Sequence, residues 1–146
     1  MVRINLFFDQ FEDQSSPNHN IIRLKCGVQF RTPEGWGLPY SGVVDTGAHT
    51  SVLPFSVWKE VVVKHQQDYT VFGLSKKEEC ALSGTLAKVN LLLIDEKGNQ
   101  SKEMEATFFL AETDQFPIIL GFNGLLDKFK VTFNLIENSG YIEGQS

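Results

Sequence analysis

The stretch that decides the fold is Gly-Val-Val-Asp-Thr-Gly-Ala-His-Thr-Ser-Val-Leu, residues 42–53. It places the carboxylate of Asp45 directly after an apolar run, and a small hydroxyl residue, a glycine and an alanine follow. Backbone N–H groups of a tight turn can fix the orientation of such a carboxylate, and Gly47 permits both a sharp turn and the close approach of a ligand. The alternative is an ordinary Asp-x-Gly turn between two strands. These residues alone do not decide between a site and a turn.

Alternating apolar residues predict strands on both sides of this stretch. Residues 22–30 alternate with a period of two, and residues 41–44 lead into Asp45. Residues 82–94 and 104–110 flank the turn signal at residues 95–99 and predict an antiparallel pair. The other expected elements are a loop at residues 10–20, a turn at 32–39, short helices at 54–62 and 123–129, and a last strand at 131–135. About seven strands and two short helices give one mainly β domain over residues 1–146.

A second motif stands some seventy residues downstream, in the stretch Phe-Pro-Ile-Ile-Leu-Gly-Phe-Asn-Gly-Leu-Leu, residues 116–126. Taken alone, its apolar run closed by Gly121 is equally a plain buried strand. The two motifs in this order, with a long hairpin between them, resemble the retroviral-type aspartic proteases, the retropepsins, and their cellular and bacterial relatives. In that family an Asp-Thr/Ser-Gly-Ala loop is braced from below by an apolar-apolar-Gly segment. The resemblance covers roughly residues 21–135 and implies a closed barrel of the acid protease fold, as a single lobe.

The resemblance also implies a function, that of a homodimeric aspartic endopeptidase without a cofactor that hydrolyses a peptide or protein substrate. It makes Asp45 catalytic, with Thr46 hydrogen-bonding across the dimer axis. The expected supporting residues are Thr46, Gly47, Ala48 and Gly121, and the expected substrate contacts are Gly47, Ala48, His49, Leu74, Ser75 and Cys80. The last three belong to the flap, a hairpin over residues 74–82 that closes over substrate.

Because each chain has one candidate catalytic aspartate, an active site with two carboxylates requires two chains. Peptide hydrolysis by carboxylates needs one ionised group to take a proton from water and one protonated group to support the carbonyl oxygen. Two carboxylates that lie close together share a single proton, so the ionised one and the protonated one can fill these two roles. None of the other six aspartates is followed by Thr-Gly or Ser-Gly. The partner of Asp45 is therefore Asp45 of a second copy, related by a twofold axis.

The chain departs from the family pattern in two places. The flap tip reads Ser-Lys-Lys-Glu-Glu-Cys, residues 75–80, where family flaps are glycine-rich, and a solvated charged hairpin without a substrate role is the alternative. His49 and Phe122 replace an acidic residue and an arginine that form an ion pair in retroviral members. His49 either contacts substrate or is a polar residue beside the cleft. The alternative hypothesis for the function is therefore a catalytically inactive dimerisation or peptide-binding module of the same fold.

The composition of the chain argues against several kinds of partner and site. A net charge of -5 and a pI near 5.1 disfavour a nucleic-acid partner, which needs clustered Lys and Arg. The three histidines show no metal-ligand spacing, so no metal site is expected. The two cysteines favour reduced thiols, and no stretch has the length of a membrane span. We expect a cytoplasmic protein with no membrane partner.

Overall fold

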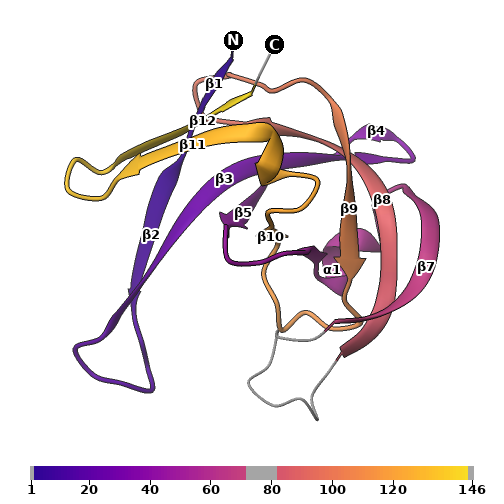
Figure 1. The fold of residues 1–146 in the computed structure, drawn as a ribbon, viewed down its shortest axis with the longest axis horizontal. Helices are drawn as coiled ribbons and strands as arrows, with labels where there is room; N and C mark the ends of the chain where they lie inside the picture. Colours follow the sequence, from indigo (N-terminus) through magenta and orange to yellow (C-terminus); the bar gives the residue numbers. More distant parts are fainter. Residues whose placement is uncertain (1, 72–81, 145–146) are drawn as a thin grey trace.

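The computed structural model describes residues 2–71 and 82–144, which form a mainly β fold with 56% strand against 5% helix (Figure 1). The elements in chain order are β1 Arg3–Asn5, β2 Phe7–Glu12, β3 Asn20–Thr32, β4 Gly35–Trp36, β5 Tyr40–Val44, β6 Ser51–Leu53, α1 Phe55–Trp58, β7 Val63–Val71, β8 Leu82–Ile94, β9 Met104–Leu110, β10 Ile119–Leu120, the 3₁₀ turn η2 Leu126–Lys128, β11 Phe129–Asn134 and β12 Ser139–Gly144.

Six of the described strands close a barrel. The order is β3, β5, β10, β6, β9 and β8, and β8 closes the ring by pairing with β3 over Gly27–Phe30. Most neighbours are antiparallel, but β10 runs parallel to β5 and β6 runs parallel to β9. The expected mainly β domain and its closed barrel are therefore confirmed.

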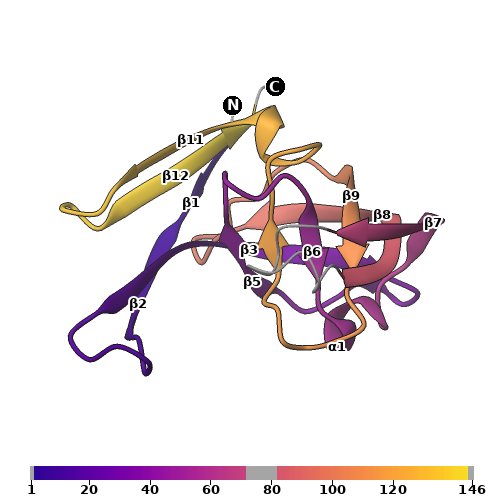
Figure 2. The ribbon, with the colours of Figure 1, turned by 60° about the horizontal axis from the view of Figure 1, so that its bottom comes forward.

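The two longest strands extend beyond the barrel. β3 and β8 have 13 residues each, or roughly 43 Å at 3.3 Å per residue. The first half of β3 pairs with β2, and its second half pairs with β8. In the same way β8 pairs first with β7 and then with β3. The β2–β3 ribbon and the ribbon of β11 and β12 both project from one side of the barrel (Figures 1 and 2).

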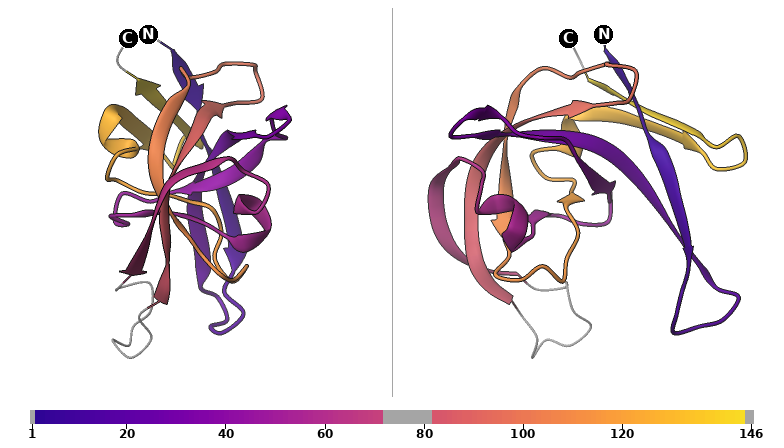
Figure 3. Two further views of the ribbon diagram at one scale, coloured as in Figure 1. Left: turned by 90° about the vertical axis from the view of Figure 1, so that its right-hand side faces the viewer. Right: turned by 180° about the vertical axis from the view of Figure 1, so that it is seen from behind.

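The barrel interior is filled by alternate residues of its long strands. On β3, Cys26, Val28 and Phe30 are at most 1% exposed, and Phe30 meets Phe108 of β9 edge to face at 5.8 Å between ring centroids. Ile4 and Ile142, from the paired strands β1 and β12, are also buried in this core cluster. The core thus includes residues on both sides of the span 21–135 that the resemblance covers. Helix α1 lies against the outside of the barrel (Figure 3).

Most predicted elements are present, with corrected limits. The strands predicted at residues 82–94 and 104–110 coincide with β8 and β9. The loop predicted over residues 10–20 is wrong at its ends, because residues 10–12 belong to β2 and residue 20 begins β3. The ladder of β2 with β3 holds these polar residues in strand form. The two predicted helices shrink to α1, four residues, and the three-residue η2.

Candidate active site

Asp45 stands where β5 leaves the barrel. Val44, one residue earlier, is buried, while Asp45 itself is partly exposed. The backbone N–H of Gly47 donates a hydrogen bond of 3.0 Å to the Asp45 carboxylate, and the N–H of Ala48 donates one of 3.2 Å to the Asp45 carbonyl. A side-chain oxygen bound by the N–H two residues on is an Asx turn. The turn therefore fixes the orientation of the Asp45 carboxylate.

The segment around Gly121 holds this turn from below. The Asp45 N–H donates to the Leu120 carbonyl at 3.0 Å, and β10 runs parallel to β5. Beyond Gly121, the N–H of Phe122 donates to the Ala48 carbonyl at 2.8 Å, and that of Asn123 to the His49 carbonyl at 3.0 Å. The prediction that the Asp45 loop packs against residues 119–121 is confirmed.

Gly121 is required by the closeness of the two segments. A Cβ at this position would lie 2.8 Å from the backbone carbon of Thr50, 2.9 Å from the Ala48 carbonyl oxygen and 2.9 Å from the Ser51 nitrogen. Contacts below 3.0 Å with backbone atoms cannot be relieved by rotating a side chain. Any larger residue would thus push the strand after the Asp45 turn away from its support.

Ser51 is a supporting residue that the sequence analysis missed. Its side chain is completely buried, and its Oγ accepts a hydrogen bond of 2.8 Å from the Gly121 N–H. This bond satisfies a buried backbone donor that would otherwise be costly. The signal in the sequence is a serine at the start of the apolar run Ser-Val-Leu, residues 51–53, but that pattern does not reveal its partner.

The outer side of the turn is open. Thr46, Gly47 and His49 are exposed, and Phe122 is 50% exposed beside them. Within the described residues, Asp45 forms no ion pair and the Thr46 hydroxyl makes no hydrogen bond. In this part of the chain the turn is held by its own backbone N–H groups and by the segment around Gly121, and the Asp45 carboxylate keeps acceptor capacity beyond the Gly47 N–H.

The expected flap cannot be placed beside this turn. Leu74, Ser75 and Cys80 lie outside the described residues, and so does most of the hairpin predicted at residues 74–82. The strands that flank the segment are described, and Val71 of β7 pairs with Leu82 of β8. The two residues on either side of the segment outside the description are therefore paired with each other in one antiparallel ladder.

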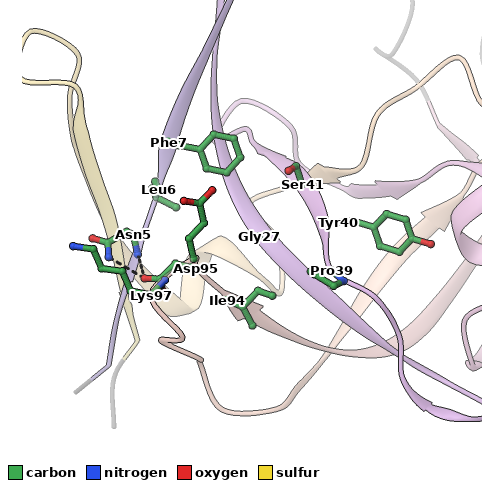
Figure 4. A pocket seen from close by; sticks show the side chains of 11 residues that line it. Asn5, Leu6, Phe7, Gly27, Pro39, Tyr40, Ser41, Ile94, Asp95 and Lys97 are labelled. Atoms are coloured by element: carbon green, nitrogen blue, oxygen red, sulfur yellow. Dashed lines mark hydrogen bonds between the residues drawn. The ribbon is translucent and has the colours of Figure 1, made fainter.

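A cavity of about 420 Å³ lies at the other end of β5 from Asp45 (Figure 4). Leu6, Phe7 and Tyr40 line it, together with the turn that begins at Asp95. The Asp95 carboxylate accepts five hydrogen bonds of 2.8–3.0 Å, from the backbone and side chain of Asn5, the backbone of Lys97, and the backbone and side chain of Asn99. Asp95 therefore holds its own turn together.

These contacts set the charge of Asp95. Partial burial raises the pKa of this carboxyl, but the hydrogen bonds from Asn5, Asn99 and Lys97 outweigh it and lower the pKa from 3.8 to about 2. Asp95 is thus ionised near neutral pH. Its negative charge also acts on the free thiol of Cys26. The pKa of this thiol is raised to about 12, mainly by burial and further by the Asp95 charge. Such a thiol is unreactive.

Two further features are absent from the part of the chain that the structure describes. Among residues 2–71 and 82–144, no three His, Cys, Asp or Glu side chains gather closely enough to hold a metal ion. In the same part of the chain, no helix has the length and apolar character that crossing a membrane requires. Comparison of the chain with protein-family models and with curated proteins found no match.

Proposed function

We propose that this chain is one half of a homodimeric aspartic endopeptidase with the retropepsin-like fold, and that Asp45 is its catalytic residue. The observation that carries the proposal is the placement of this carboxylate. It stands at the exit of a barrel strand, oriented by the Gly47 N–H at 3.0 Å, in a turn bonded to the segment around Gly121. Preorganised carboxylates of this kind suit general acid–base chemistry.

The chemistry requires two copies of the turn. With two carboxylates close together, repulsion raises the pKa of one and lowers that of the other, so the pair shares one proton. The ionised group takes a proton from water as the water oxygen attacks the peptide carbonyl carbon. The protonated group donates a hydrogen bond to the carbonyl oxygen, and a proton then passes to the leaving amine as the C–N bond breaks. Water is the nucleophile, so no acyl-enzyme forms.

The residues around Asp45 take supporting roles in this proposal. The exposed Thr46 hydroxyl hydrogen-bonds across the twofold axis and joins the two turns. Gly47 and Ala48 line the cleft, and an extended peptide binds there as an added strand, with backbone hydrogen bonds for affinity and side-chain pockets for preference. His49 is exposed at the end of this turn, where it contacts substrate. The flap residues Leu74, Ser75 and Cys80 complete the cleft in the same proposal.

We also propose a cytoplasmic location for the enzyme. Cys26 is free and buried in the barrel, as expected of a chain that folds in a reducing compartment.

The direct test is the Asp45→Asn variant, assayed with a peptide library at mildly acidic pH. Asparagine keeps the side-chain shape and the acceptor for the Gly47 N–H, but it cannot share a proton, so cleavage should fall by a factor of at least ~10³. Asp13→Asn is the matched control, because Asp13 also accepts the N–H two residues on, that of Ser15 at 2.9 Å. Parent and control should cleave at the same rate.

The outcomes separate the two functions considered for this fold. Equal cleavage by Asp45→Asn and the parent would assign catalysis to another residue. A parent that binds library peptides without cleaving them would support the inactive peptide-binding module instead. Mixing parent with Asp45→Asn chains under dissociating conditions should inhibit beyond simple dilution, since each mixed dimer loses its pair of carboxylates.

A further inference from the structure

The cavity near the start of β5 lies outside the barrel, beside a strand position without a side chain. Gly27 of β3 pairs with Ser41 of β5, and both residues line the cavity. Figure 4 shows the Phe7 ring and the Ser41 hydroxyl on opposite sides of Gly27. Successive residues of a strand face opposite sides of a sheet. Since Cys26 and Val28 belong to the core inside the barrel, Gly27 and this cavity lie on the outer face.

The walls of the cavity are mainly apolar. Leu6 and Phe7 come from the junction of β1 and β2, Pro39 from the connection before β5, and Ile94 from the end of β8. Phe7 is 45% exposed, so its ring is available to a ligand. The volume of about 420 Å³ falls in the range of roughly 300–1,000 Å³ that is typical of small-molecule sites, which combine apolar walls with a few polar groups. The cavity thus has the size and lining of such a site.

The charges on one wall of the cavity are negative. Asp95 and Glu96 both line it. Asp95 is ionised near neutral pH, but its two carboxylate oxygens are already occupied by five hydrogen bonds. Glu96 is exposed, and its carboxylate takes part in none of the ion pairs among the described residues. This wall therefore combines a fixed negative charge with a second carboxylate that can bind a ligand.

The nearby lysines do not neutralise this wall. Lys97 also lines the cavity, but Figure 4 shows its side chain beside Asn5 and turned away from the Phe7 ring. Lys25 stands opposite Phe7 in the ladder of β2 and β3, and its ammonium group is already bound to Asp9 at 3.1 Å. The cavity is therefore left with a net attraction for positive charge.

An aromatic ring near a free carboxylate suits a positively charged ligand. The face of a phenyl ring such as that of Phe7 attracts ammonium groups, and a carboxylate such as that of Glu96 forms charge-assisted hydrogen bonds with them. The Ser41 hydroxyl can accept a further hydrogen bond from the same group. Leu6 and Ile94 supply apolar surface for the rest of the ligand.

We propose that this cavity binds an organic cation, in which an ammonium group is carried by an apolar or aromatic body. The ammonium group lies between the Phe7 ring and the Glu96 carboxylate, and the apolar body packs against Leu6 and Ile94. The proposal does not depend on the peptidase activity, because none of these residues belongs to the Asp45 turn or to the segment around Gly121.

The test uses three small probes of similar shape and different charge. Phenethylammonium carries a ring and a cation, phenethyl alcohol has the same length without the charge, and hydrocinnamate carries a negative charge instead. Binding to the whole chain is followed by the NMR shifts of backbone amides, and those of Phe7, Gly27 and Ser41 should respond. Phenethylammonium should bind at least ~10-fold more tightly than the alcohol, and hydrocinnamate should bind most weakly.

Two variants assign the charge and the ring. Glu96→Gln keeps the shape of the side chain without its charge, so it should remove most of the preference for phenethylammonium over the alcohol. Phe7→Leu keeps an apolar wall without the ring, so it should weaken phenethylammonium binding about 3–10-fold. Glu137→Gln is the matched control, because Glu137 is also an exposed glutamate of a turn between strands, that of β11 and β12. The amide spectrum of each variant shows whether it is folded.

Each outcome decides the proposal. A preference for phenethylammonium that shifts the amides of the cavity and depends on Glu96 supports it. Equal binding of the three probes, an unchanged preference in Glu96→Gln, or shifts confined to residues around Asp45 would overturn it. Absence of binding at millimolar concentrations, the range expected of so small a probe, would do the same.

The natural source of the cation is a separate question with its own probe. Acetyl-phenylalanyl-lysine amide presents the same ring and ammonium group on a peptide backbone. Tighter binding of this peptide than of phenethylammonium supports a cation site that is filled by a basic protein segment. Weaker binding of the peptide supports a cation site for a free small molecule.

Discussion

Replacing Gly121 with alanine should both destabilise the fold and disable the site. The added Cβ would lie within 2.8–2.9 Å of three backbone atoms of residues 48–51. Carbon atoms in comfortable contact are about 3.5–4.0 Å apart, so the strand after Asp45 must move by roughly 0.5–1 Å. Overpacking of this kind costs about 1–3 kcal/mol. We expect the upper part of that range, because no flexible side chain is present to yield.

The same displacement acts on catalysis. The hydrogen bonds from Phe122 and Asn123 to Ala48 and His49 connect Gly121 to the Asp45 turn, so moving one segment moves the other. A misplacement of about 1 Å at a reacting group can cost ~10²-fold in rate. Gly121→Ala should therefore lower kcat by about that factor even at temperatures where the protein is fully folded.

Two measurements check this reasoning. Urea denaturation followed by circular dichroism gives the free energy of unfolding, and peptide cleavage at low temperature gives kcat. Gly37→Ala is the control, because the closest backbone atom to its Cβ would be the Phe30 carbonyl oxygen at 3.5 Å, an ordinary contact distance, and the only closer atom is a side-chain methyl group of Thr32 at 3.0 Å. If Gly121→Ala unfolds at the same urea concentration as the parent, the close approach described for Gly121 is wrong. If it loses stability but keeps the parent kcat, the segment does not position Asp45.

The remaining predictions concern Ser51 and Asp95. Ser51→Ala removes the acceptor for the buried Gly121 N–H, so urea denaturation should show a loss of about 1–3 kcal/mol, whereas Ser41→Ala, at an exposed position, should change little. A pKa lowered from 3.8 to about 2 means that Asp95 stabilises the fold above pH 4 and that this contribution is lost as pH falls through 2. It amounts to roughly 1–2 kcal/mol after allowance for solvent screening. Asp95→Asn should therefore be less stable than the parent at pH 6, and the difference should shrink toward pH 2; a constant difference across this range would contradict the assignment.

Strands with one buried face were the most predictable part of the fold. The limits of β8 and β9 could be predicted because alternate residues such as Val89 and Ala106 pack into the barrel, while their direct neighbours are at least partly exposed. The packing of the Asp45 turn against Gly121 was implied by the family resemblance that the two motifs carry. Both predictions rest on positions where burial or close backbone contact restricts the residue type.

The ribbons were poorly predictable for the opposite reason. Beyond the barrel both faces of β2 meet water over much of their length, so Gln10 and Glu12 stand where a buried strand would carry apolar residues. A strand without a buried face shows little alternation of apolar and polar residues. The register of β2 against β3 then depends on cross-strand contacts such as the ion pair of Lys25 with Asp9. Ser51 escaped prediction because its partner, the Gly121 N–H, is 70 residues away.

The construction of the Asp45 turn favours a site over a plain connection. A turn that only joined two strands would gain little from a buried serine, a glycine without room for a Cβ, and backbone bonds from a distant segment. Here all of these hold the inner side of the turn, while the Asp45 carboxylate accepts only the Gly47 N–H among the described residues and Thr46 is exposed. Rigid support behind an oriented carboxylate with acceptor capacity to spare is the arrangement expected of a functional site.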